Sequence, residues 1–317
     1  MQQNVTGNVR APILELRSRM ERGLIGLEGL VERLLVGLLG GGHVLVEGAP
    51  GLAKTRAVKL LAGGLDASFA RIQCTPDLMP ADLTGTSVFR PDRGLFEFVE
   101  GPVFHSLVLV DEINRAPPKV QSALLEAMAE RQVTSGGATR GLPDPFMVIA
   151  TQNSIEHEGT FPLPEAQLDR FMLHVQLQLP STEAERRILD LVEAETPGTN
   201  GAKLSRAEVL NAREAAMAVH LSPALRDYIV RLVTATRGAD MSTVVAHAVS
   251  PRGTLALAVA AKARAWLSGR DHALPEDVAA FACDALAHRL VLNWRAAAEG
   301  DTPRAVIARL LGRIEPL

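Results

Sequence analysis

The chain has 317 residues and a mass of 33.9 kDa, which suits two domains better than one or three. Its 47% apolar and 22% charged residues exclude an intrinsically disordered protein, and its net charge of −3 excludes an overall basic coat for nucleic acid. A local basic channel is compatible with this charge, but the aromatic content of 4% argues against a stacking platform for single strands.

The N-terminal segment lacks the pattern of a signal peptide. Residues 1–10 are polar, and arginines interrupt the segment that follows. Apolar runs such as 34–39 and 255–261 are much shorter than the roughly 20 residues of a membrane span. We therefore expect a cytoplasmic protein without membrane insertion.

The first 180 residues alternate between helical and strand patterns. Residues 1–22 are expected to form a frayed tail that leads into a helix. His43 stands just before a buried run and is expected to be a packing or capping residue. Apolar runs predict strands at 43–47, 70–74, 107–110, 146–150 and 172–179, and helical spacing predicts helices at 27–38, 54–65 and 117–128. This alternation indicates a three-layer α/β domain with a mainly parallel sheet over residues 23–180.

The pattern changes after Pro180. Thr182 and Ser205 each have a glutamate three residues later, and this capping box is typical of a helix start. Further apolar stripes at helical spacing follow, and we find no strand pattern. The sequence therefore predicts a smaller, all-helical domain over residues 181–317.

The loop after the first predicted strand has the composition of a phosphate-binding loop. Its residues are Gly48, Ala49, Pro50, Gly51, Leu52, Ala53, Lys54 and Thr55. Backbone N–H groups of such a loop and of the helix after it point at the β-phosphate. Lys54 would bridge the β- and γ-phosphates, and the Thr55 hydroxyl would coordinate Mg²⁺. Ala53 stands where the strict pattern has Gly, and its methyl group is tolerable if the backbone there is helical.

A second motif follows the strand predicted at 107–110. Asp111 and Glu112 stand at its end, and the carboxyl ends of parallel strands meet where open α/β sheets bind ligands. Asp111 would hold Mg²⁺ through water, and Glu112 would orient and deprotonate the attacking water. An apolar run that ends in two acids is a weak signal alone, but downstream of a phosphate loop it is strong.

These motifs resemble those of the AAA+ ATPases of the MoxR family, over about residues 25–286. The most specific stretches are 111–119, 121–128, 150–153, 158–171 and 250–253. Ala53 is a variant that this family itself has. The resemblance implies a P-loop AAA+ core followed by a helical lid, with ATP and ADP as ligands and Mg²⁺ as the metal.

The family's roles carry over to matching positions. Asn153 resembles sensor 1, an amide between the γ-phosphate and the attacking water. Arg170 resembles the arginine finger that reaches the γ-phosphate of a neighbouring subunit. Arg252 resembles sensor 2 on a lid helix, which reports the nucleotide state. Ile25 and Gly26 resemble the motif whose apolar side chain packs on adenine.

Two segments resemble the pore-facing loops of related motors. Residues 75–105 resemble the helix-2 insert of this AAA+ clade. Val133-Thr134 and Thr139-Arg140 flank a Gly-containing turn and predict a β-hairpin at about 132–141. An alternative reading of both segments is an inert surface excursion.

The resemblance implies a homo-oligomeric ring, expected to be a hexamer, with each active site between two subunits. It further implies a chaperone-like role in remodelling or maturing a protein complex, with a partner that carries a von Willebrand factor A domain.

Two other functions stay open. The first is a DNA-acting motor of the helicase kind, against which the acidic pI and low aromatic content argue. The second is a nucleotide-gated binding module, against which Glu112, Asn153 and Arg170 argue together.

Overall fold

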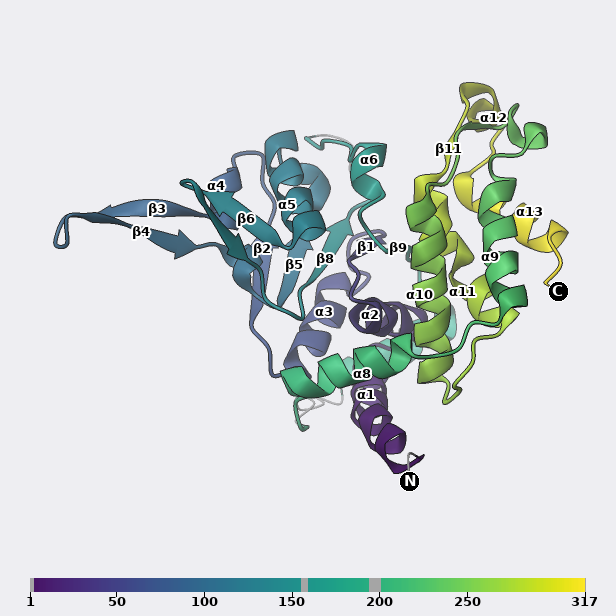
Figure 1. Cartoon of the computed structure of the whole chain (residues 1–317), viewed down its shortest axis with the longest axis horizontal. Coiled ribbons are helices and arrows are strands. Elements are labelled where there is room, and N and C mark those ends of the chain that lie inside the picture. The colour runs from purple at the N-terminus through teal and green to yellow at the C-terminus, as the bar shows by residue number, and fades with distance from the viewer. Residues whose placement is uncertain (1–2, 155–158, 194–200, 317) are drawn as a thin grey trace.

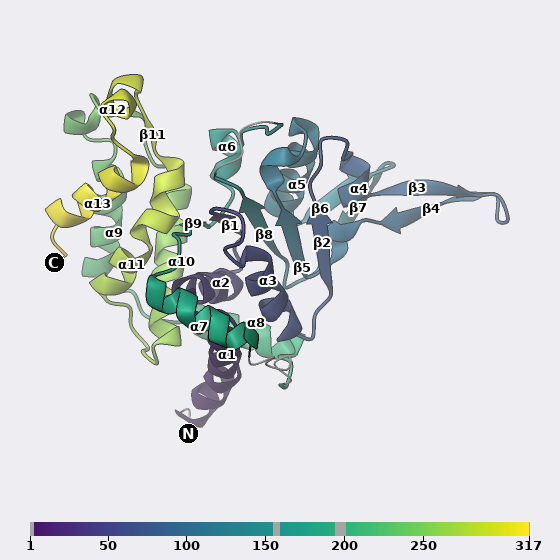
Figure 2. The same ribbon diagram turned by 180° about the vertical axis from the view of Figure 1, so that it is seen from behind.

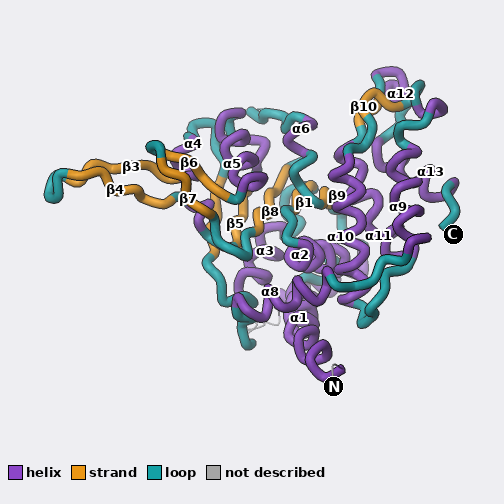
Figure 3. Tube along the Cα trace, viewed as in Figure 1, coloured by secondary structure: helices purple, strands orange, loops and turns teal. Residues whose placement is uncertain are grey.

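The computed structural model describes residues 3–154, 159–193 and 201–316 of the chain. An α/β core lies beside an upright group of helices (Figure 1), and the view from behind shows the same division (Figure 2). Strands gather mainly in the core, and the second region is mostly helical (Figure 3). The expected α/β core with a parallel sheet and the expected helical character of the second region are therefore confirmed.

The core is built on a five-stranded sheet in the order β2-β5-β8-β1-β9, with every neighbouring pair parallel. β5 is buried along its whole length and β8 along all but its last residue, as their apolar sequences require of a sheet covered on both faces. The strands are β1 (Val44–Glu47), β2 (Phe69–Gln73), β5 (Leu107–Asp111), β8 (Met147–Gln152) and β9 (Leu173–Gln176).

Helices cover the two faces of this sheet. Val44 and Val46 belong to a core shared with α2 and α3, whereas Leu45, between them, belongs to the core beneath α5. This alternation follows from the period of two in a strand. The helices are α2 (Glu28–Gly40), α3 (Lys54–Gly63) and α5 (Pro118–Glu130). The three layers place the loops after β1, β5 and β8 at one edge.

The N-terminal segment differs from the expected frayed tail. α1 (Gln3–Gly23) is one helix of 21 residues. Ile13, Leu16 and Met20 are buried, and the helix packs against α8, α2 and α3. Its apolar residues come only every third or fourth position, so tertiary packing rather than a long apolar run stabilises it.

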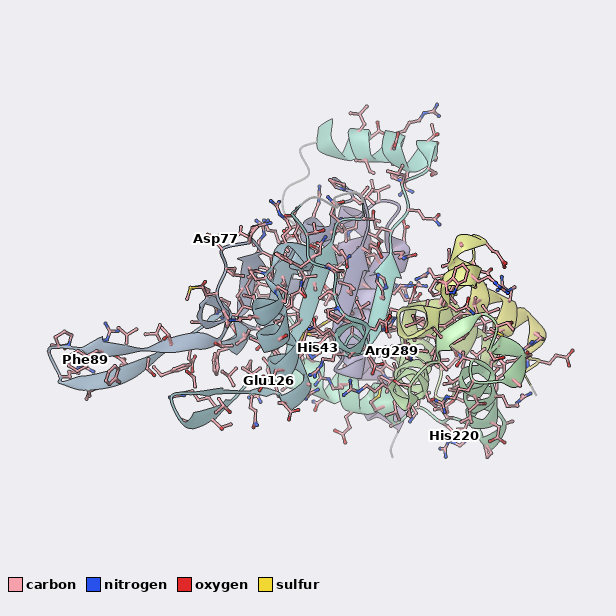
Figure 4. The ribbon with its side chains drawn as sticks, turned by 90° about the horizontal axis from the view of Figure 1, so that it is seen from above. His43, Asp77, Phe89, Glu126, His220 and Arg289 are labelled. Carbon is pink, nitrogen blue, oxygen red and sulfur yellow. The ribbon has the colours of Figure 1, made fainter. Side chains whose placement is uncertain are left out.

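Two antiparallel hairpins extend from the core (Figures 1 and 4). The predicted hairpin at 132–141 is confirmed, and Gly136 and Gly137 form its turn at φ 60° and 77°. The longer hairpin occupies the expected insert and exposes Phe89 and Phe96. These elements are α4 (Pro80–Thr84), β3 (Gly85–Arg90), β4 (Leu95–Glu100), β6 (Gln132–Ser135) and β7 (Ala138–Gly141).

The C-terminal region is predominantly helical, but it is not free of strands. β10 pairs with β11 in a small antiparallel ribbon, which corrects the all-helical expectation. These strands have three and two residues, too few to show an alternating pattern. The elements are α7 (Thr182–Glu193), α8 (Arg206–Met217), α9 (Pro223–Ala235), β10 (Val245–His247), α10 (Pro251–Leu267), α11 (Pro275–Leu286), β11 (Val291–Leu292), α12 (Trp294–Ala298) and α13 (Pro303–Arg313).

Short 3-10 turns complete the chain. They are η1 (Pro102–Phe104), η2 (Ile113–Arg115), η3 (Ala239–Met241) and η4 (Ala287–Arg289), and a further short α-helix, α6 (Glu165–Leu168), precedes β9. Helices long and apolar enough to cross a membrane are absent from the described part of the chain.

Candidate active site

The loop between β1 and α3 has the conformation of a cradle for phosphate. Gly51 has φ 83°, and a Cβ built there meets nothing within 4 Å. Ala53 has φ 52° and ψ 21°, in the left-handed region, so its methyl group is accommodated without the helical backbone named above as the condition for it. Lys54 Nζ donates to the carbonyl oxygen of Gly48 and, over 3.0 Å, to that of Ala49. The lysine therefore lies along the inside of the loop.

Asp111 meets Thr55 at the mouth of this loop. Thr55 Oγ1 donates to Asp111 Oδ2 over 3.2 Å, and Thr151 Oγ1 donates to Oδ1 over 2.6 Å. Burial acts to raise the pKa of Asp111, but hydrogen bonds from Thr151 and Arg71 outweigh it and hold the pKa below its usual range. An ionised carboxylate and a hydroxyl are oxygen ligands of the kind that Mg²⁺ prefers, so the pair fits this metal.

Glu112 has an unusual backbone conformation for its residue type. Its φ of 57° and ψ of 53° lie in the left-handed region, and its N–H donates to Thr151 Oγ1 over 3.0 Å. Gln73 Nε2 donates to Glu112 Oε2 over 3.0 Å, and Arg115 Nη1 lies 3.2 Å from the same oxygen. Strained backbone that a neighbouring side chain holds in place is typical of functional sites.

One pocket of about 390 Å³ gathers the phosphate loop and both carboxylates. Asn153, just after β8, is 6% exposed and lines this pocket. Its lining residues are Pro50, Gly51, Leu52, Ala53, Lys54, Thr55, Arg71, Gln73, Asp111, Glu112, Thr151 and Asn153. The structure therefore brings the phosphate loop, the Thr55 hydroxyl, both carboxylates and the Asn153 side chain together.

A larger hollow of about 580 Å³ adjoins the other side of the loop. Ile25 and Gly26 line it together with Gly51, Leu52 and Ala53. Residues from β9, α7, α11 and α13 close its walls, among them Val175, Ala184, Asp284 and Arg304. A largely apolar hollow next to a phosphate loop suits a nucleobase, which agrees with the expected position of Ile25 and Gly26.

Arg170 and Arg252 lie elsewhere. Among the described residues, neither arginine lines the two hollows beside the phosphate loop. Both line a separate hollow of about 320 Å³, which they share with Asp169 and Arg289. Arg170 Nη1 donates to the carbonyl oxygen of Leu125 over 2.8 Å. In this arrangement Arg252 therefore lies outside the phosphate-loop pocket of its own chain.

Asp169, next to Arg170, is held by the lid. Ser250 Oγ donates to Asp169 Oδ1 over 3.0 Å, and Arg252 Nη1 lies 3.4 Å from Oδ2. Arg289 Nε donates to Oδ1 over 2.8 Å, and its Nη2 donates to the carbonyl oxygens of Asp169 (3.0 Å) and Phe171 (2.6 Å). Figure 4 shows Arg289 at the boundary between core and lid. The segment before β9 is thus fixed to the lid of its own chain.

The sequence did not single out three residues that touch the carboxylates. Arg71 and Gln73 come from β2, and Thr151 from β8. Two polar residues alternate on β2 beside the strand that carries Asp111, and that pattern could have marked them. Within the stretches of sequence that carry the family resemblance, only Glu158 lies outside the described residues.

Two family models match the chain. A model of the ATPase family associated with various cellular activities (AAA) matches residues 43–173. A model of the AAA lid domain matches residues 237–310. The first segment contains the phosphate loop and both carboxylates. The second contains the C-terminal helices α10, α11 and α12.

Several known proteins are similar over most of the chain. Chaperone MoxR1 of Mycobacterium tuberculosis is 47% identical over 298 residues, which are 92% of this chain and 79% of that protein. Protein MoxR of Paracoccus denitrificans is 34% identical over 296 residues, 85% of this chain and 86% of that protein. The crystal structure of a candidate ATPase from Cytophaga hutchinsonii superposes with a TM-score of 0.90 at 41% identity, covering 98% of this chain and 97% of that one.

Proposed function

Because the chain belongs to the MoxR family of chaperone-like AAA+ ATPases, we propose that it hydrolyses ATP to ADP and phosphate with Mg²⁺. The observation that carries the proposal is the 3.2 Å contact between Thr55 Oγ1 and Asp111 Oδ2, in a pocket that Lys54 and Glu112 also line. This pocket combines the groups that phosphoryl transfer to water requires: an anion cradle, oxygen ligands for the metal and a base.

The chain's residues supply position and charge. Lys54 leaves the loop carbonyls and bridges the β- and γ-phosphates, while the N–H groups of the loop and of α3 bind the phosphate oxygens. Mg²⁺, when bound, neutralises charge on these phosphates. Glu112 orients the attacking water and accepts its proton, and Asn153 holds that water in line with the γ-phosphate.

In this proposal, Arg170 and Arg252 act on the nucleotide of a neighbouring subunit. Arg170 and Arg252 share a hollow separate from the phosphate-loop pocket, which supports a role on the phosphates of another copy rather than their own. A homo-oligomeric ring, expected to be a hexamer, places such a surface against the next subunit's pocket. Both arginines then stabilise charge that develops on the γ-phosphate.

The work done by the ring is remodelling or maturation of a protein complex, with a von Willebrand factor A domain protein as partner. The similarity to chaperone MoxR1 supports the chaperone role. The long β3–β4 hairpin supports it as well, because it extends away from the core and carries exposed Phe89 and Phe96. Exposed apolar residues on a projecting element are typical of contacts with other proteins.

Two variants of the purified chain test the ATPase. Lys54→Ala should lose tight ATP binding, because it removes the cation that bridges the phosphates. Glu112→Gln should bind ATP as the wild type does but release phosphate at least about 100-fold more slowly, because the amide cannot accept a proton. Binding is measured with a fluorescent nucleotide and turnover by phosphate release. Unchanged turnover of Glu112→Gln would show that the pocket binds nucleotide without hydrolysing it by this route.

The same assay separates the chaperone from a DNA-acting motor. DNA should leave the turnover of the wild type unchanged. Stimulation by DNA that declines steeply with salt, as counterion release requires, would favour the motor instead.

A further inference from the structure

Two polar side chains of the edge strand β2 reach the carboxylates of the active site. Arg71 and Gln73 are two residues apart, so they lie on the same face of the sheet. Arg71 donates to Asp111 Oδ2 through Nη2 (2.8 Å) and Nε (3.2 Å). Arg71 Nη2 also donates to Gln73 Oε1 over 2.9 Å, and Gln73 in turn donates to Glu112. Arg71 therefore reaches the active site through the carboxylate of Asp111.

The oxygen that Arg71 occupies is the one beside Thr55. Asp111 Oδ2 accepts from Arg71 and from the Thr55 hydroxyl, whereas Oδ1 is bonded to Thr151. Mg²⁺ held by the Thr55 hydroxyl and, through water, by Asp111 would compete with Arg71 for the negative charge of this carboxylate. Two cations on one small carboxylate repel each other, and a guanidinium bound to it reduces its attraction for the metal.

Arg71 is also able to move. Its side chain is 44% exposed, in contrast to 10% for Asp111, so it can leave the carboxylate without breaking packed core. It lines the same pocket as the phosphate loop, where phosphate oxygens offer a guanidinium a strong alternative partner. The arrangement thus gives Arg71 two anionic partners within one pocket.

We propose that Arg71 competes with Mg²⁺ for Asp111 and thereby sets the Mg²⁺ concentration at which the site binds nucleotide. Arg71 is a positioning residue that acts through Asp111. On metal binding, the Arg71 guanidinium would leave Asp111 for the phosphate oxygens in the same pocket, which would couple metal binding to nucleotide binding. This inference rests on the proposed ATP site and adds a determinant of its metal dependence.

The test measures nucleotide binding rather than turnover. A fluorescent ATP analogue is titrated into the full chain at a series of Mg²⁺ concentrations and in EDTA. Arg71→Gln should lower the half-saturating Mg²⁺ concentration about fivefold, the size expected when one partly exposed ion pair is removed. Arg71→Lys keeps the charge without the two-pronged contact and should lower it about twofold. A loss of structure alone would raise the Mg²⁺ requirement or abolish binding.

Arg115→Gln is the matched control. It removes an arginine of the same charge from the same carboxylate cluster, one that pairs with Glu112 at 3.2 Å. Its half-saturating Mg²⁺ concentration should equal that of the wild type. An unchanged or higher Mg²⁺ requirement in both Arg71 variants, or an equal fall in Arg115→Gln, would overturn the inference. Failure of the wild type to bind nucleotide at any Mg²⁺ concentration would overturn the proposed function instead.

Discussion

Two residues of the active site have left-handed backbone although neither is glycine. Ala53 has φ 52° and Glu112 has φ 57°. Each such residue costs roughly 1–2 kcal/mol relative to right-handed backbone. The hydrogen bond from Glu112 N–H to Thr151 helps to hold Glu112 in its left-handed conformation. Looking for glycine in the sequence does not reveal such positions, because surrounding contacts rather than the local sequence enforce the left-handed backbone.

His43 is buried just before β1 and has two hydrogen bonds. Its Nδ1 accepts the Val148 N–H over 2.9 Å, and its Nε2 lies 3.3 Å from the Met128 carbonyl, to which it donates. The ring also contacts Phe146 edge-on at 5.5 Å between centroids. This is the packing role predicted from the sequence. Burial, with a smaller contribution from Arg131, lowers the pKa of His43 to about 4.

The lowered pKa predicts a loss of stability in acid. The unfolded chain binds a proton at His43 near pH 6.5, whereas the folded chain does so only near pH 4. Between these values the unfolded state binds more protons, so the free energy of unfolding falls as pH falls. His43 alone should account for about 3 kcal/mol of the loss. Buried His288 adds a loss of the same sign, because burial lowers its pKa as well.

His43→Gln isolates this contribution. Urea unfolding of both proteins at pH 7.5, 6.5, 5.5 and 4.5 gives the free energy of unfolding at each pH. The variant should be less stable at pH 7.5, since the glutamine packs less well, but its stability should decline less steeply below pH 6.5. Equal slopes in the two proteins would contradict the assignment.

At the scale of elements, Asp277 joins α10 to α11. Its side chain is fully buried and accepts hydrogen bonds from Arg264 (2.6 Å) and from two nitrogens of Arg270 (both 2.7 Å). It also accepts the Leu274 N–H over 2.8 Å, which caps the first turn of α11. One carboxylate therefore sets both the start of a helix and its contact with the neighbouring helix.

Asp277→Ala should destabilise the chain by about 3 kcal/mol, because it leaves two arginines without their buried partner and removes a helix cap. The free energy of unfolding from urea titration measures the loss. Glu276→Ala is the control: this neighbour is exposed, and its removal should change stability by less than about 0.5 kcal/mol. Equal effects of the two substitutions would show that the network contributes little.

Elements with a strong local pattern could be predicted from the sequence. The buried runs that form most of β1, β5 and β8 are apolar without interruption. The residues of the loop after β1 by themselves indicate phosphate binding. The ribbon of β10 and β11 could not be predicted, since Val245 and Leu292 pair across 47 residues of sequence and each strand is very short. Long-range pairing of this kind leaves no periodic trace.

At the scale of the whole molecule, only the part of the site that lies at the carboxyl edge of the sheet could be predicted. Lys54, Asp111, Glu112 and Asn153 follow parallel strands that end at one edge, so the topology alone brings them together. The position of Arg252 depends on how the lid packs on the core, which no local pattern encodes. The structure places it beside Arg170.

The proposed ring makes a prediction about mixed assemblies. Arg170→Ala should bind ATP but lose turnover, and Lys54→Ala should lose both tight ATP binding and turnover. A one-to-one mixture should recover up to about a quarter of wild-type turnover, since one neighbouring pair in four combines both intact groups. Phosphate release after mixing and reassembly is the measurement.

The control mixture combines Lys54→Ala with Glu112→Gln. Every site in it lacks either Lys54 or Glu112, so turnover should not recover. Absence of recovery in the first mixture, with co-assembly shown by a tag on one variant, would contradict a shared site.

The attachment of Asp169 to the lid has a mechanical consequence. Three lid side chains, those of Ser250, Arg252 and Arg289, hold the residue directly before Arg170. In the proposed ring, a rotation of the lid in one subunit would therefore carry Arg170 with it. In the proposed ring, that movement inserts or withdraws a charge at the next subunit's phosphates. The movement of each lid then controls when the neighbouring subunit hydrolyses its ATP. The order of hydrolysis around the ring is passed on by these movements.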